Sequence, residues 1–154
     1  MYIAMILLLM LVLPVGSVLV EIFAWHSDTT WIALIGKWFV FWGVGMRLAV
    51  AGGLQVFAPV FTAGALDIKD PKANVLIREL GFGNLAIGVT GVLSLILPMW
   101  TLAAAMCGGL FYGFAGTQHA LTRKRNMSEN WALASDLFLF LVMAAYVGVS
   151  LATR

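Results

Sequence analysis

The chain has 154 residues, of which 62% are hydrophobic and only 10% charged, with nine Lys and Arg against seven Asp and Glu. An average soluble domain carries about 25% charged residues, so this composition excludes an ordinary soluble fold and indicates a membrane protein. The small basic excess does not predict nucleic-acid binding, because the basic residues lie beside apolar runs. Cys107 is the only cysteine, which excludes an intramolecular disulfide within one chain and leaves the redox compartment undetermined.

Five apolar runs occupy nearly all of the chain, and each is close to the roughly 20 residues that cross a bilayer. The first lacks the positively charged start of a cleaved signal peptide, so we expect it to be retained. Pro59 and a polar loop after Ala65 end the second, and the short turn Pro98-Met99-Trp100 joins the third to the fourth. The predicted spans are residues 2–24, 31–57, 80–97, 101–122 and 131–152.

These runs predict an all-α fold, a polytopic transmembrane helical bundle that forms one domain over residues 1–154. The longest polar segment, residues 67–79, is too short to bury a core, so no soluble catalytic domain is expected. A bundle of four spans, with one run re-entrant or interfacial, is the alternative.

Charged residues at the ends of the runs predict the orientation. With five spans, six basic residues fall on one side and two on the other. By the positive-inside rule the first side is cytoplasmic, so the N-terminus is expected inside and the C-terminus outside. The first group is Lys69, Lys72, Arg78, Arg123, Lys124 and Arg125, and the second is Lys37 and Arg154.

Small residues recur at every fourth position in two runs, which allows helix backbones to approach closely in lipid. Such stripes predict packing, either within the chain's own bundle or against a second copy or another membrane subunit. The stripes are Gly45, Ala49 and Gly53 in the second run, and Ala105, Gly109 and Gly113 in the fourth.

Arg47 is the most informative polar residue, because at about 1.5 Å per residue it lies roughly 15 Å from the inner end of its span. An arginine at that depth costs about 2.5 to 3.5 kcal/mol, so it requires a partner or water. Topology places five other polar side chains in the same inner half of the bundle. They are Glu79, Asn84, Gln118, His119 and Asp136.

Two interpretations of this group remain open. In one, Arg47 and Asp136 are the charged pair of a cytoplasm-facing cavity, with His119 titrating near neutral pH, that binds an anionic headgroup, a quinone or a small solute. In the other, the group is a structural network that neutralises buried charge and fixes the helices. The sequence does not decide whether Arg47 pairs with Asp136 or with Glu79.

At the outer surface, Glu21 and Lys37 are predicted to form an ion pair beside His26 and Asp28. His26 and His119 fall on opposite sides of the membrane, so they cannot share a metal ion within one chain. No catalytic or cofactor motif such as HExxH, GxSxG or a Walker loop is present. We therefore predict no catalytic residue and no metal site, while a quinone or a lipid remains compatible with the chain.

Several short segments together carry a resemblance. They are Ala58-Pro59-Val60-Phe61-Thr62-Ala63-Gly64, Asp70-Pro71, Arg78-Glu79-Leu80-Gly81 with Asn84, Gly88 and Gly91, and Gly108-Gly109-Leu110-Phe111-Tyr112-Gly113 with His119. From about Ala51 onward the chain resembles a family of small bacterial multi-pass membrane proteins of unknown function. More distantly, its layout is similar to DoxX-like membrane proteins. The resemblance implies the bacterial cytoplasmic (inner) membrane and supplies no reaction.

Three functions follow as hypotheses. The favoured one is a non-enzymatic accessory or structural subunit that packs, in contact with membrane lipids, in a homo-oligomer or with other membrane subunits. The alternative is a small-solute or ion carrier that uses Arg47, Asp136 and His119. The third is a quinone- or lipid-linked redox component of the membrane.

Overall fold

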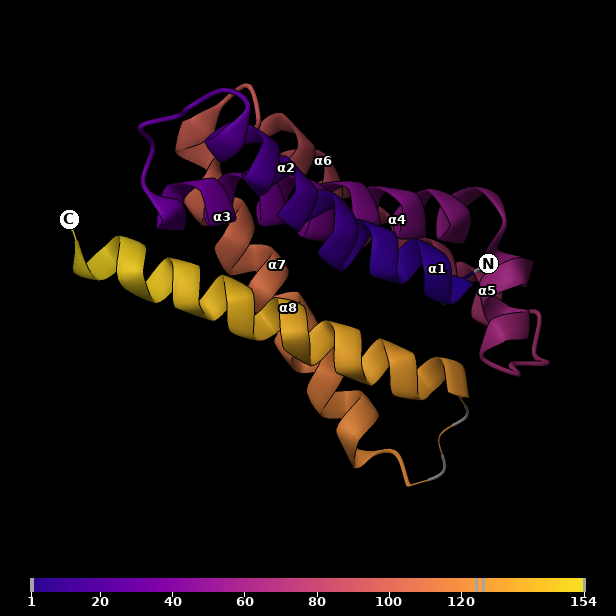
Figure 1. Cartoon of the computed structure of the whole chain (residues 1–154). Coiled ribbons are helices and arrows are strands. Elements are labelled where there is room, and N and C mark those ends of the chain that lie inside the picture. Colours follow the sequence, from indigo (N-terminus) through magenta and orange to yellow (C-terminus); the bar gives the residue numbers. More distant parts are fainter. Residues whose placement is uncertain (1, 124, 126, 154) are drawn as a thin grey trace.

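A computed structural model describes residues 2–123, 125 and 127–153 (Figure 1). Its described residues are overwhelmingly helical and include no strand. Five helical stretches are long and apolar enough to span a membrane, which confirms the predicted all-α fold with five spans. They are Ile3–Phe23, Trp31–Phe57, Ala73–Leu93, Pro98–Leu121 and Glu129–Ala152.

Each of the first two spans is interrupted by a π-helical segment, which the sequence analysis did not predict. The first consists of α1 (Tyr2–Leu7), η1 (Leu8–Val12) and α2 (Leu13–Phe23). Its π segment ends two residues before Pro14, which cannot donate the backbone hydrogen bond that a regular helix requires there. The second consists of α3 (Trp31–Phe39), η2 (Val40–Met46) and α4 (Arg47–Phe57), so its π segment ends directly before Arg47.

The predicted limits of the third span were wrong, because α6 runs from Ala73 to Leu93 rather than over residues 80–97. A short helix, α5 (Pro59–Ala65), and a turn precede it. In that turn Asp70 accepts the backbone N–H of Lys72 on its side chain and that of Ala73 on its carbonyl, which starts the helix early. A helix continues through exposed polar residues when its backbone hydrogen bonds are made, so the polar residues within 73–79 do not limit α6.

The last two spans form a helical pair in which α7 crosses α8 (Figure 1). A single 3-10 turn, η3 (Pro98–Trp100), leads into α7 (Thr101–Leu121). The final helix, α8, covers Met127–Ala152, so it begins four residues before the predicted start at residue 131. In this view the first residues of α1 lie at the α5 end of the bundle, and the last residues of α8 lie at the end where α3 begins (Figure 1).

The second span is the centre of the bundle, because its residues contribute most to the buried core. Val40 and Val44 are fully buried there, together with Leu139 and Met143 of α8. The rest of the core cluster consists of Phe39, Leu48, Ala104, Ala105 and Tyr112.

Glycines allow α6 to lie directly against the second span. A Cβ atom on Gly45 would stand 2.7 Å from the backbone nitrogen of Val92, and one on Gly91 would stand 2.7 Å from the Cα of Gly45. Only hydrogen at these positions permits the contact. By contrast, Gly53, the last residue of the predicted stripe, has open space around the corresponding Cβ position.

Candidate intramembrane ion-pair site

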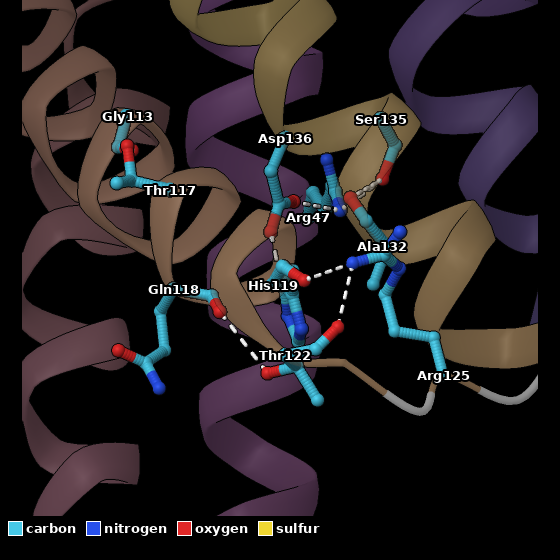
Figure 2. Close-up of polar contacts among 10 residues, drawn as sticks. All are labelled: Arg47, Gly113, Thr117, Gln118, His119, Thr122, Arg125, Ala132, Ser135 and Asp136. Carbon is cyan, nitrogen blue, oxygen red and sulfur yellow. Dashed lines mark hydrogen bonds and ion pairs between the residues drawn. The ribbon is translucent and has the colours of Figure 1, made fainter.

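The central feature of the site is an ion pair between the second and fifth spans. Arg47, the first residue of α4, donates from Nη2 to Oδ1 of Asp136 at 2.8 Å and to the hydroxyl of Ser135 at 2.9 Å (Figure 2). The side chains of Arg47 and Asp136 are only 11% and 8% exposed. The two charges are therefore neutralised by each other and shielded from the surroundings of the bundle.

Tyr112 of α7 forms one wall of the site. Its ring centroid lies 4.9 Å from the guanidinium carbon of Arg47, which is cation–π distance. Its hydroxyl donates to the carbonyl oxygen of Gly43, in η2, at 2.6 Å. The site thus joins three spans, and the π segment beside Arg47 supplies one of its hydrogen-bond acceptors.

Sequence reasoning missed both Tyr112 and Ser135. Ser135 adjoins Asp136 in the chain, and it also donates to the carbonyl of Ala132 at 2.9 Å. Tyr112 lies in the glycine-rich segment that carried the family resemblance, and its burial to 1% exposure is the property that the sequence did not indicate. The sequence signal for this burial was the position of Tyr112 between Gly109 and Gly113, where small residues allow a neighbouring helix to come close.

His119 connects the buried pair with the surface. Its Nε2 lies 4.0 Å from Oδ2 of Asp136, and its side chain is 27% exposed at the C-terminal end of α7 (Figure 2). Arg125 closes this end of the helix, because its Nη1 donates to the carbonyls of His119 and Thr122 at 2.9 and 2.7 Å. The Nε of Arg125 also donates to the Asn130 side chain at 3.0 Å, so one residue ties the end of α7 to the start of α8.

The other predicted members of the inner group do not reach the ion pair. Asn84 is buried, and its amide nitrogen donates to the side chain of Gln55 at 2.7 Å, so it links α6 to α4. Glu79 and Gln118 are exposed, and the Gln118 side chain points away from Arg47 (Figure 2). Arg47 therefore contacts Asp136, one of the two partners that the sequence left open.

The predicted outer-face residues Glu21 and Lys37 also lie together. The Lys37 ammonium donates to both carboxylate oxygens of Glu21, at 2.8 and 3.0 Å. Trp38, which sequence reasoning missed, donates from its indole nitrogen to the same carboxylate at 2.6 Å. His26 and Asp28 are exposed in the loop between α2 and α3.

The arrangement neutralises charge and joins helices. Within residues 2–123, 125 and 127–153, no three His, Cys, Asp or Glu side chains converge as a metal site requires. Two open apolar grooves lie away from Arg47, with volumes of about 360 and 210 Å³. The larger lies along the first span, and the smaller lies between α6 and α7.

Comparison with known proteins identifies a family. Residues 3–153 match the model described as "Family of unknown function (DUF6790)". The chain matches no curated protein and no solved structure, and the family match provides no link to DoxX-like proteins and no activity. Because the match covers nearly the whole chain, the protein belongs to the family of unknown function DUF6790.

Proposed function

We propose that this protein is a non-enzymatic membrane subunit that packs against other copies of itself or against other membrane subunits. The observation that carries the proposal is the mutual neutralisation of Arg47 and Asp136. A solute site would present such charges to an open polar cavity, whereas here Ser135 and the ring of Tyr112 complete an internal contact. Buried polar groups of this kind fix the arrangement of helices.

The groove between α6 and α7 supports the proposed packing. Its volume of about 210 Å³ lies below the 300 to 1,000 Å³ that is typical of small-molecule pockets. Small side chains line most of it, and small residues are what membrane helices use for close association. The lining is Ala86, Ile87, Thr90, Ala103, Ala104 and Cys107.

Native mass spectrometry of the protein, gently extracted from its own membrane, tests the proposal. A homo-oligomer or a defined complex with another membrane protein is the expected result. Cys107 provides an independent test for the homo-oligomer, because it is exposed in the groove and is the chain's only cysteine. Oxidation in the intact membrane would then produce a disulfide-linked dimer that Cys107→Ser abolishes. A monomer in both experiments would refute the proposal.

The second candidate is a small-solute or ion carrier. His119 favours it, because this partly exposed side chain places an imidazole between Asp136 and the surface. The carrier requires Arg47, so Arg47→Gln would abolish uptake into vesicles while the protein still inserts. If the variant and the original protein gave the same uptake, a carrier that depends on Arg47 would be excluded.

We also propose that the host membrane is the bacterial cytoplasmic membrane, with the N-terminus inside and the C-terminus outside. The basic loops support this orientation, since Lys69, Lys72, Arg123 and Arg125 all belong to connections on the predicted inner side. The orientation is measured by labelling single cysteines, Lys69→Cys or Asp28→Cys, each introduced into the Cys107→Ser variant. Reagents that cannot cross the membrane would label only position 28 in intact cells.

A further inference from the structure

The larger groove lies on the first span, away from the Arg47 site and from the α6–α7 face. It has a volume of about 360 Å³, which falls within the range of ligand pockets. The lining residues are Val12, Leu13, Gly16, Ser17, Val20, Trp25 and Trp38. We propose that this groove binds one phospholipid, with an acyl chain along the first span and the phosphate beside Lys37.

The lining suits a hydrocarbon chain. Ser17 provides the only side-chain hydroxyl, and it already accepts the indole N–H of Trp42 at 3.0 Å. The groove is apolar and open to its surroundings, and in a bilayer the molecules available to fill it are lipids. A hydrocarbon chain can therefore lie along the groove without a polar group of its own.

The dimensions match one leaflet of a bilayer. Val12 and Val20 are eight residues apart, which corresponds to about 12 Å along a helix. Half of a hydrocarbon core of roughly 30 Å is about 15 Å. Trp25, which is 66% exposed, marks the end of the groove that reaches the interface, where tryptophan is enriched. The groove thus extends from near the bilayer centre to the headgroups.

Hydrogen bonds and an ion pair fix the side chains at the polar end of the groove. Trp38, which forms one wall, is held through its indole nitrogen by the buried carboxylate of Glu21. The Lys37 ammonium lies 4.9 Å from the centroid of the Trp38 ring and is bound to both oxygens of Glu21. An ammonium carries three N–H donors, and the Lys37 side chain remains 36% exposed. A phosphodiester oxygen is the acceptor in a phospholipid that complements the remaining N–H donor of this partly exposed ammonium.

Gly16 keeps the groove open, because a Cβ atom there would meet nothing within 4 Å. Gly16→Leu would therefore fill the hollow without disturbing the protein's own packing. Gly148→Leu is the matched control, because Gly148 also lies on a span and also has open space around its Cβ position. Both substitutions raise helix propensity to a similar degree.

The experiment is native mass spectrometry of the three proteins, with the number of phospholipids per chain counted as collision energy is raised. We expect one phospholipid per chain to resist removal in the original protein and in Gly148→Leu, and the affinity for it to fall about tenfold in Gly16→Leu, equivalent to about 1.4 kcal/mol. Equal retention in all three proteins, or no retained lipid in any, would overturn the proposal. So would an isoprenoid quinone, or a partner protein without lipid, in its place.

A second variant keeps the test informative if Gly16→Leu does not insert. Val12→Phe narrows the same groove from its wall, and Val12 is 57% exposed, so no core packing is lost. This variant is expected to lose the phospholipid as well. Retention of the lipid in Val12→Phe would contradict the site, whatever the oligomeric state of the protein.

Discussion

The hydroxyl of Tyr112 donates a 2.6 Å hydrogen bond to the carbonyl oxygen of Gly43, so α7 is attached to the π segment of the second span. The ring of the same tyrosine lies against the Arg47 guanidinium. A single side chain therefore contacts both the irregular part of the helix and the charge that follows it. The π segment is stabilised by a tertiary contact as well as by its own backbone.

Tyr112→Phe tests this contact. The substitution keeps the ring against Arg47 and removes only the donor to Gly43. We expect a loss of about 1 kcal/mol in the free energy of unfolding, because side-chain hydrogen bonds within membrane proteins are worth about 0.6 kcal/mol on average and up to about 1.7 kcal/mol. Equilibrium unfolding in detergent measures it. Tyr146→Phe is the control, since Tyr146 is half-buried, and a similar loss there would contradict the assignment.

The Arg47–Asp136 pair predicts strong coupling between two substitutions. Arg47→Met or Asp136→Leu alone leaves one charge buried, which costs about 3 to 5 kcal/mol. The double variant removes both charges and is expected to recover most of the lost stability. A double-mutant cycle measures the coupling, and simple addition of the two losses would rule out a direct pair.

Glycines at the contact of α6 with the second span predict position-specific effects of alanine. Gly91→Ala places a methyl group 2.7 Å from the Cα of Gly45, where backbone cannot give way, so we expect a loss of about 2 kcal/mol or more. Gly83→Ala, on the same helix, meets nothing within 4 Å and is expected to be neutral or to stabilise by up to about 1 kcal/mol. Thermal unfolding of Gly91→Ala and Gly83→Ala, measured under the same conditions, compares their stabilities. Equal effects would argue against the close approach of the helices.

The outer pair predicts an asymmetry between its two members. Lys37→Met leaves the Glu21 carboxylate, which is 7% exposed, with Trp38 as its remaining donor, and we expect a loss of about 2 kcal/mol. Glu21→Gln retains an acceptor for Trp38, and the partly exposed lysine can extend to the headgroups. That variant should lose under about 1 kcal/mol. If unfolding measurements showed a larger loss of stability for Glu21→Gln than for Lys37→Met, they would contradict this account.

Much of the fold could be predicted from the sequence, because hydrophobic length alone determines the number of spans. The second span matched its predicted limits, residues 31–57, whereas α6 began at Ala73 because the backbone bonds of Asp70 start a helix that composition does not reveal. The π segment of the second span was not predictable, since it lies at a tertiary contact, the hydrogen bond of Tyr112 with Gly43.

The site could be predicted only in part. Depth in the membrane identified Arg47 and Asp136, because charge there requires a partner. Depth could not place Asn84, which lies on the face of α6 toward Gln55 rather than toward Arg47. Rotation of a helix about its axis decides such contacts, and a uniformly apolar helix gives little indication of that rotation.

The separation of the ion-pair partners has a consequence for biogenesis. Arg47 and Asp136 are 89 positions apart, so the arginine leaves the ribosome long before the carboxylate that binds it. At about 5 to 20 residues per second, the interval is roughly 4 to 18 s. Throughout that time the second span carries an arginine into the membrane without Asp136. A chain truncated before α8 would therefore lack the carboxylate that neutralises Arg47 in the complete bundle.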